Sequence, residues 1–262
     1  MKLLVPWRKT SEKTSREFYG LKLDIPLKRL PAIDLFNFGW LGFFIGSLSF
    51  MVSYFGYLFW KKISGEEMVI YTIDMDNFSF LAVPFLKRPY FAELHDAKKK
   101  NIFWNFFFKR IKGLIVINQL IKEEIKKNFS LADEKILVFP NGIDLEFFEG
   151  FERLAARNRL NLPINKKIVL YLGKFYQWKG LEILIELASR LDENTLLYFV
   201  GGDKKELERI TNQSFSRNNI ICVGQRDYKE IPEWLAAADI LLVLGTKKNE
   251  YSYLHTSPMK LF

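Results

Sequence analysis

The sequence has a single cysteine, Cys222, and only two histidines, His95 and His255, among its 262 residues. One cysteine excludes an intrachain disulfide and any metal site made of several cysteines. The two histidines are too far apart in the chain to follow a metal-ligand spacing. A Walker P-loop and a complete G-x-G-x-x-G pattern are also absent, which argues against ATP hydrolysis and classical dinucleotide binding. We therefore expect no metal and no resident cofactor.

The sequence also has little in common with disordered chains, because 49% of its residues are hydrophobic and 26% are charged. Its 39 basic and 30 acidic residues give a net charge of +9. A basic protein attracts nucleic acid, anionic lipid or phosphorylated substrates. Because no recognised nucleic-acid-binding module is visible, we expect no nucleic-acid partner.

A stretch without any charged residue, 35–60, has the length of a membrane span. Glycine and serine recur in it at steps of three and four, so they share one helical face that another backbone can approach closely. These residues also dilute its hydrophobicity, which favours a buried or peripheral helix. A transmembrane helix stays open as the alternative.

Apolar segments alternate with amphipathic ones over the rest of the chain. Strands are predicted at 69–73, 90–94, 113–117 and 135–139, and helices at 97–112 and 119–128. A charged linker and helix over 146–167 precede a second series, with strands at 168–172, 196–200, 219–223 and 240–244 and helices at 180–191, 204–211 and 231–237. The alternation predicts an α/β fold of two Rossmann-like domains, residues 1–148 and 149–262, whose parallel sheets face a cleft.

Both ends of the sequence differ from what such domains usually contain. Ser257-Pro258 signals the start of a helix, but the chain stops at Phe262, too soon for a stable helix. The N-terminus opens with a polar segment instead of the usual first strand. We therefore expect a chain truncated at both ends, with both domains incomplete.

Two lysines flanked by glycines give the strongest indication of chemistry. Gly173-Lys174 and Lys179-Gly180 lie between the predicted strand 168–172 and the helix that follows it. A loop at the carboxyl end of a strand, where a helix begins, presents amide groups and a positive dipole to phosphate. The lysines are spaced to bracket a diphosphate. Two solvated loop lysines would explain these residues alone equally well.

Other candidates also follow predicted strands. Gly201 and Gly202 allow a turn that a ligand can approach closely, although a simple turn is the commoner explanation. His95 ends the strand 90–94, where it is well placed for a ligand, yet a lone histidine is more often structural. Asp74 and Asp76 follow the strand 69–73, where they could hold a cation or an acceptor hydroxyl, although solvated loop carboxylates are the better explanation.

The order of these motifs resembles family 4 of the retaining glycosyltransferases, which have the GT-B fold. The resemblance extends over nearly the whole chain from Val69 onward. It is carried by Val138–Asp144 (VFPNGID), Tyr171–Lys174 with Lys179-Gly180, Phe199–Gly202, Val223–Gln225, Leu235–Leu242 and Ser257–Phe262.

The resemblance implies an N-terminal domain that binds the acceptor and a C-terminal domain that binds a nucleotide sugar. His95 would be the catalytic residue that reaches the donor sugar. The donor-binding residues would be Gly173, Lys174, Lys179, Gly201 and Gly202 around the diphosphate, Gly224 and Gln225 at the nucleobase, and the loop of Ser257, Pro258 and Met259 at the phosphates. Of the family's two donor-site glutamates, one position holds His255 and the other would fall beyond Phe262.

The expected function is transfer of a sugar, with retention, from a UDP- or GDP-linked donor to a glycan or lipid-linked acceptor, as in polysaccharide biosynthesis. Lysines and amides would stabilise the departing diphosphate without a metal. The alternative is a non-catalytic or degraded relative that binds a nucleotide sugar.

The segment 97–112 mixes basic residues with large aromatic ones and predicts an interfacial helix on an anionic membrane. Its basic residues are Lys98, Lys99, Lys100, Lys109, Arg110 and Lys112. We accordingly expect a cytoplasmic protein, peripheral on the inner face of the membrane. The alternative is that the aromatics pack inward on the sheet while the lysines are solvated.

Overall fold

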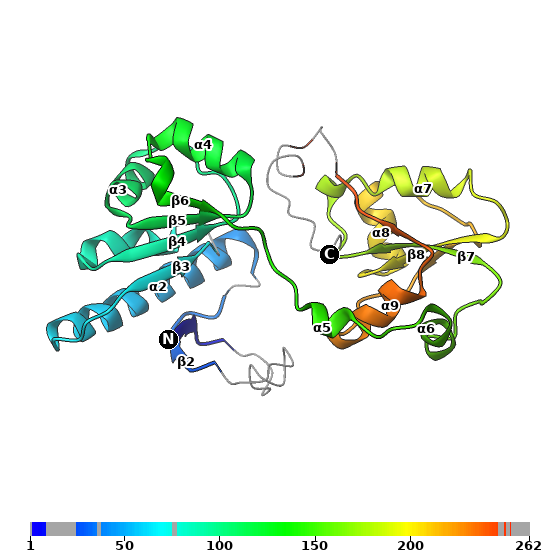
Figure 1. The fold of residues 1–262 in the computed structure, drawn as a ribbon, viewed down its shortest axis with the longest axis horizontal. Coiled ribbons are helices and arrows are strands. Elements are labelled where there is room, and N and C mark those ends of the chain that lie inside the picture. Colours follow the sequence, from blue (N-terminus) through cyan, green and yellow to red (C-terminus); the bar gives the residue numbers. More distant parts are fainter. Residues whose placement is uncertain are drawn as a thin grey trace. The chain divides into compact units, whose positions relative to one another are not determined.

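The computed structural model describes residues 2–8, 25–35, 38–74 and 78–245, together with Asn249 and Ser252. It contains two compact units, which divide between Pro140 and Asn141 (Figure 1). The domain boundary expected after residue 148 lies beyond the short helix α5 (Leu145–Phe148). Phe147 of α5 stacks on Tyr228 with ring centroids 4.9 Å apart, so α5 packs within the second unit.

The sheet of the first unit consists of β3 (Ile70–Ile73), β4 (Tyr90–Leu94), β5 (Gly113–Val116) and β6 (Ile136–Val138), in that order. Every pair of neighbours is parallel. Alternate residues of β4 are buried while Phe91 is exposed, because successive side chains of a strand point to opposite faces. The buried set forms one apolar core.

Two capped helices follow the strands of this sheet. In α3 (Ile102–Arg110), the side chain of Asn101 accepts a hydrogen bond from the amide of Trp104 at 2.8 Å. In α4 (Gln119–Phe129), Asn118 caps the first turn in the same way. The helix predicted at 97–112 is therefore shorter at both ends. Asn101 fixes where it begins, and the extended backbone of Ile111 ends it.

The aromatic side chains of α3 mostly pack inward. Trp104, Phe107 and Phe108 are buried, and Trp104 and Phe107 lie against Phe80 of the 3₁₀ segment η1 (Ser79–Leu86) with centroids 5.2 and 5.3 Å apart. The expectation that this helix inserts its rings into a membrane is thus corrected for these three residues. Ile102 and Phe103 remain exposed.

The first unit begins with a strand, contrary to the sequence-based expectation. The strand β1 (Leu3–Pro6) pairs in parallel with β2 (Leu27–Leu30) in a separate two-stranded sheet. A four-residue strand next to polar sequence gives too short an apolar pattern to be recognised.

The uncharged stretch forms the helix α2 (Gly39–Ile63), which packs on η1 and β2. Ser49 accepts a hydrogen bond from the amide of Ile33 at 2.8 Å, and Ser53 donates one to the carbonyl of Pro31 at 2.5 Å. Tyr54 donates its hydroxyl proton to the carbonyl of Ser79. Small residues therefore do face the rest of the unit. By length and composition α2 could also cross a membrane. Only 22% of its most apolar 18-residue stretch is buried inside the unit.

The sheet of the second unit has the order β10-β7-β8-β9, again all parallel. Its strands are β7 (Lys167–Leu172), β8 (Thr195–Val200), β9 (Ile220–Cys222) and β10 (Ile240–Leu242). All six residues of β8 are buried, which suits a central parallel strand covered on both faces.

Helices cover the two faces of this sheet (Figure 1). One face packs against α7 (Glu182–Ala188) and α8 (Lys204–Thr211). The other packs against Trp234 of α9 (Ile231–Ala237) and against Leu160, which follows α6 (Arg153–Arg159). The remaining short elements of the described chain are the 3₁₀ turns η2 (Asp133–Lys135), η3 (Gln177–Lys179) and η4 (Tyr228–Glu230). The eight predicted strands are all confirmed as β3 to β10, and α8 and α9 have the predicted bounds.

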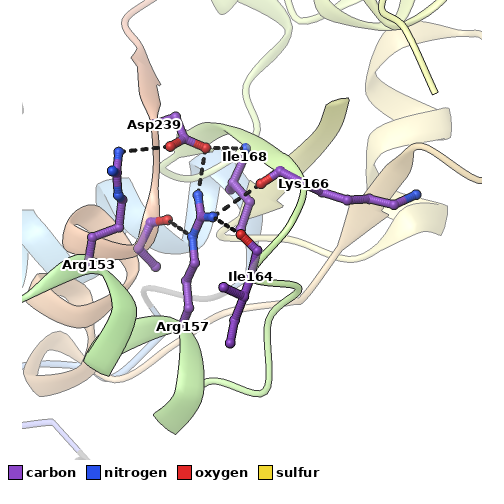
Figure 2. Close-up of polar contacts among 7 residues, drawn as sticks. Arg153, Arg157, Ile164, Lys166, Ile168 and Asp239 are labelled. Carbon is purple, nitrogen blue, oxygen red and sulfur yellow. Dashed lines mark hydrogen bonds and ion pairs between the residues drawn. The ribbon is translucent and has the colours of Figure 1, made fainter. Parts of the chain in front are cut away.

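A buried arginine fastens α6 to the amino ends of β7 and β10 (Figure 2). Arg157 donates to Asp239 at 2.6 Å and to the carbonyls of Ala237, Ile164 and Lys166 at 2.9, 3.2 and 3.1 Å. The same Asp239 oxygen accepts the amide of Ile168 at 2.7 Å. Burial alone would raise the pKa of Asp239, but these hydrogen bonds outweigh it and hold the pKa below its usual range.

Candidate functional site

Three glycine loops meet at the carboxyl ends of β7, β8 and β9. The amide of Gly173 donates to the carbonyl of Val200 at 2.8 Å, and that of Gly201 to the carbonyl of Gly224 at 2.8 Å. All three glycines have positive φ, 143°, 133° and 77°, which other residues rarely adopt. A Cβ on Gly201 would overlap the carbonyl group of Gly173. The glycines predicted from sequence therefore form one compact edge of backbone beyond the carboxyl ends of these strands.

Gly202 and its neighbour complete this edge. A Cβ on Gly202 would overlap the ring of Phe175, which is buried beneath it. Asp203 then caps α8 by accepting the amide of Glu206 at 2.8 Å. The tight fit explains why two consecutive glycines end this strand.

Lys179 has an unusual environment beside this edge. Its ammonium donates to the carbonyl of Lys174 at 3.2 Å and lies over the rings of Tyr171, Tyr176 and Trp178 at 5.8, 5.4 and 5.4 Å. Burial lowers the pKa of this lysine. Among the described residues, no carboxylate forms an ion pair with it. A half-buried cation that is held by rings and a carbonyl is suited to bind an anion.

The other predicted donor-site residues are only partly accounted for. Lys174 is exposed, and its backbone carbonyl lies against Lys179. Gln225 is exposed next to Gly224. Ser257, Pro258 and Met259 lie outside the described residues, as do His255 and Asp76. The structure thus brings Lys174 and Lys179 together with the glycine edge.

His95 lies just beyond the carboxyl end of β4 in the first unit and forms a hydrogen-bonded chain. Its Nε2 lies 2.8 Å from Oε1 of Glu93, and Tyr71 donates its hydroxyl proton to Oε2 of the same carboxylate. Burial would raise the pKa of Glu93, but the hydrogen bonds from Tyr71 and His95 outweigh it and lower the pKa. Burial and the bond to Glu93 raise the pKa of Tyr71 to about 12.

A second cluster beyond β3 and β4 corrects the expectation that Asp74 is a solvated loop carboxylate, and the role of Lys98 in it was not anticipated from the sequence. The ammonium of Lys98 pairs with Asp74 at 2.5 Å and also with Asp96. The Lys98 and Asp74 side chains are only 3% and 6% exposed. Burial and the adjacent Asp96 raise the pKa of Asp74 to about 7, against the opposing effect of Lys98. The prediction that Lys98 contacts a membrane surface is wrong, because its side chain is buried and its ammonium forms ion pairs with Asp74 and Asp96.

The two edges offer different chemistry. The second unit presents a glycine backbone edge and the Lys179 cation, and the cation suits phosphate. The first unit presents a histidine, a phenol and carboxylates, which suit hydroxyl groups and proton transfer. In the part of the chain that the structure describes, no three His, Cys, Asp or Glu side chains gather as a metal site.

Residues 152–250 match a family described as Glycosyl transferases group 1. WcaI of Escherichia coli (strain K12), assigned to colanic acid biosynthesis as a glycosyl transferase, is 33% identical over 135 residues, which are 49% of this chain and 32% of WcaI. The D-inositol 3-phosphate glycosyltransferase of Xylanimonas cellulosilytica is 26% identical over 133 residues, 46% of this chain and 32% of that protein. The chain therefore spans about a third of the length of these relatives.

Solved structures resemble the chain over a larger part. Anabaena HepE, in complex with UDP and glucose, matches with a TM-score of 0.60 and 20% identity, over 83% of this chain and 60% of HepE. WaaG, a glycosyltransferase involved in lipopolysaccharide biosynthesis, matches with a TM-score of 0.58 and 18% identity, over 85% of this chain and 62% of WaaG. Residues 152–250 thus match the glycosyl transferases group 1 family, and the chain has an α/β fold with parallel sheets like that of these GT-B structures.

Proposed function

We propose that this chain binds a nucleotide sugar, UDP- or GDP-linked, and transfers its sugar with retention to a glycan or lipid-linked acceptor. The observation that carries the proposal is Lys179, a half-buried cation beside a glycine edge in a glycosyl transferases group 1 domain. Glycosyltransferase names among the relatives and the UDP bound to HepE agree with it.

The proposed chemistry follows from the charge that develops as the sugar leaves. The diphosphate gains negative charge while the anomeric carbon gains oxocarbenium character. A phosphate oxygen would replace the Lys174 carbonyl as the partner of the Lys179 ammonium, at little cost, because rings already hold that lysine in place. The exposed Lys174 side chain would bind the other phosphate. His95 would contact the sugar as the catalytic residue.

Calorimetry with UDP and GDP tests the donor site. Lys179→Ala should weaken nucleotide binding by roughly 1.5–3 kcal/mol, the usual cost of losing a hydrogen bond to a charged group. Lys205→Ala, an exposed lysine on α8, is the matched control and should bind as the parent does. Unchanged affinity in Lys179→Ala would reject the assignment.

A turnover assay separates catalysis from binding. His95→Ala should lower sugar transfer far more than nucleotide affinity, because His95 is assigned to the sugar and the lysines to the diphosphate. If the parent binds nucleotide tightly but transfers no sugar to any acceptor, the chain is instead a non-catalytic nucleotide-sugar-binding protein. Equal turnover in mutant and parent would make His95 a structural residue.

The proposed location is the cytoplasmic side of an anionic membrane, with α2 as the contact. The helix has no acidic residue, and its exposed apolar side chains are Trp40, Leu41, Phe43, Phe44, Leu48, Val52, Phe59, Trp60 and Ile63. Lys61 and Lys62 lie over the rings of Trp60 and Phe59 at 5.2 and 6.0 Å. Lysines beside exposed aromatic rings are typical of a helix that lies in the headgroup layer.

The packing of α2 favours this arrangement over a membrane span. Ser49 and Ser53 hold the irregular backbone of residues 31–33 along the middle of the helix. Irregular backbone exposed to lipid is strongly unfavourable, so the middle of a spanning α2 would have to shed that segment. We therefore favour α2 lying in the membrane plane.

Liposome co-sedimentation compares α2 with the segment 97–112. Binding should need anionic lipid, fall with added salt, and weaken on Lys61→Glu with Lys62→Glu, since each basic residue contributes about 1 kcal/mol at such a surface. Lys99→Glu with Lys100→Glu serves as the matched pair outside α2. A larger loss from Lys99→Glu with Lys100→Glu would return the contact to 97–112, and equal losses would reject α2 as the specific contact. Self-association without lipid would make α2 an interface between copies.

A further inference from the structure

The hydrogen-bonded chain of Tyr71, Glu93 and His95 contains one acceptor that receives two donors. Both oxygens of Glu93 are used, Oε2 by the Tyr71 hydroxyl and Oε1 by Nε2 of His95. Tyr71 lies on β3 and Glu93 on the adjacent β4, offset by two residues, since Tyr71 is opposite Phe91 and Ile73 is opposite Glu93. The carboxylate is therefore fixed by the sheet before His95 reaches it.

An ionised carboxylate can only accept hydrogen bonds, and this decides the state of the imidazole. The pKa of Glu93 is lowered, so Glu93 is a carboxylate at neutral pH. The imidazole nitrogen that faces this carboxylate, Nε2 of His95, must then carry a proton to donate. In the neutral imidazole the other nitrogen, Nδ1, has a lone pair and no proton. No other described residue hydrogen-bonds His95, whose side chain is 39% exposed.

We propose that Glu93 is a positioning residue for His95, which it holds as the Nε2-protonated imidazole so that Nδ1 is the nitrogen offered to a ligand. The inference rests on the proposed function, in which that ligand is the sugar of the donor. An Nδ1 lone pair accepts a hydrogen bond, so the sugar must offer a hydroxyl group at this point. Tyr71 supports the arrangement indirectly, by holding the second oxygen of Glu93.

The chain offers a direct spectroscopic test, because its only histidines are His95 and His255. A ¹⁵N-histidine spectrum of the full chain, recorded about two pH units above the ordinary histidine pKa of ~6.5, has two sets of ring signals, which His95→Gln assigns. We expect His95 to show a protonated Nε2 with a slowly exchanging, downfield proton, and an unprotonated Nδ1. In Glu93→Leu that proton signal should disappear, while Glu93→Gln, whose amide oxygen still accepts, should retain it in part.

This spectrum needs no substrate, so its failure is separate from failure of the proposed function. An Nδ1-protonated His95 in the parent, or a downfield proton that survives in Glu93→Leu, would overturn the positioning role. If Glu93→Leu does not fold, Tyr71→Phe is the second variant. It removes the hydrogen bond that fixes Oε2 of Glu93, so the downfield proton signal of His95 should broaden. A downfield signal in Tyr71→Phe as sharp as that of the parent would count against the role given to Tyr71 and Glu93.

Turnover supplies the functional half of the test. Glu93→Gln should lower sugar transfer at least tenfold with little change in nucleotide affinity. In the His95→Ala background the same substitution should have almost no further effect, because the effects of residues that act as a unit are not additive. Glu134→Gln removes an exposed carboxylate at the amino end of β6 and is the matched control. Additive losses from Glu93→Gln and His95→Ala would show that Glu93 does not act through His95.

Discussion

In the first unit the buried ion pair of Asp74 and Lys98 lies beyond the carboxyl ends of β3 and β4. In the second unit the buried Arg157 pairs with Asp239 at the amino ends of β7 and β10. Ligands of parallel α/β sheets bind beyond the carboxyl ends of the strands. The first pair therefore lies beside a candidate site, whereas the second holds the domain together.

The carboxyl edges also differ. That of the second unit consists of glycine backbone and of Lys179 among aromatic rings. The Arg157 network of Figure 2 lies at the other end of the same sheet, where it holds α6. That of the first unit consists of side chains that can exchange protons, namely His95, Glu93 and Tyr71. The proposed phosphate binding and the proposed hydroxyl chemistry therefore fall in different units, so each can be altered separately.

The largest expected effect comes from the structural pair. Arg157→Ala removes the side-chain donor of three carbonyl groups and one of the donors to Asp239, which keeps Arg153 and the amide of Ile168. Because each buried acceptor without a partner costs about 1–3 kcal/mol, the free energy of unfolding should fall by about 3–5 kcal/mol. Denaturant unfolding of the full chain measures the loss. The folded fraction should bind UDP as the parent does, because the network is at the opposite end of the sheet from the glycine edge.

Arg153→Ala is the matched control for Arg157→Ala. Arg153 binds the other oxygen of the same Asp239 at 2.9 Å, but its side chain is 57% exposed. A solvent-screened pair contributes at most about 1 kcal/mol. Equal losses in the two variants would contradict the view that burial, rather than the charge pair itself, makes Arg157 important.

A smaller effect is expected at the glycine edge, where stability and binding should change together. Gly201→Ala forces a positive φ on alanine and a Cβ into the carbonyl group of Gly173, which should cost roughly 2–4 kcal/mol. The shift should also weaken UDP binding, measured by calorimetry on the folded protein. Gly142→Ala, where a Cβ would meet no atom within 4 Å, is the control. A destabilised Gly201→Ala that binds UDP normally would remove the glycine edge from the donor site.

The sequence predicted the strands well because parallel strands are short, continuous apolar runs between turn residues. Residues 195–200 are buried throughout, and 204–211 and 231–237 have the predicted helix bounds. The arrangement of the lysines and glycines at one edge also followed from their place after consecutive strands. The two four-residue strands near the N-terminus, Leu3–Pro6 and Leu27–Leu30, gave too little pattern to be recognised.

What the sequence could not show is which charges are buried. Lys98 stands in a run of three lysines that looks solvated, and its partner Asp74 is 24 residues away. Arg157 stands in a charged linker, and its partner Asp239 is 82 residues away. Pairs of that separation depend on the tertiary fold. Glu93 had a weak signal, because residues two apart in a strand share a face, which places it beside His95.

The smallest expected effect concerns Asp74 and has a definite sign. Its pKa is raised to about 7 in the folded protein, so the folded state binds this proton more tightly than the unfolded chain does. The favourable contribution is present at low pH and is lost as the pH rises through 7. From about pH 6 to about pH 8, the parent should lose ~1.4 kcal/mol relative to Asp74→Asn, which cannot titrate. Thermal unfolding of both proteins at the two pH values measures the difference. Parallel curves would mean that Lys98 holds Asp74 ionised throughout, and that the first unit's buried pair is as purely structural as that of the second.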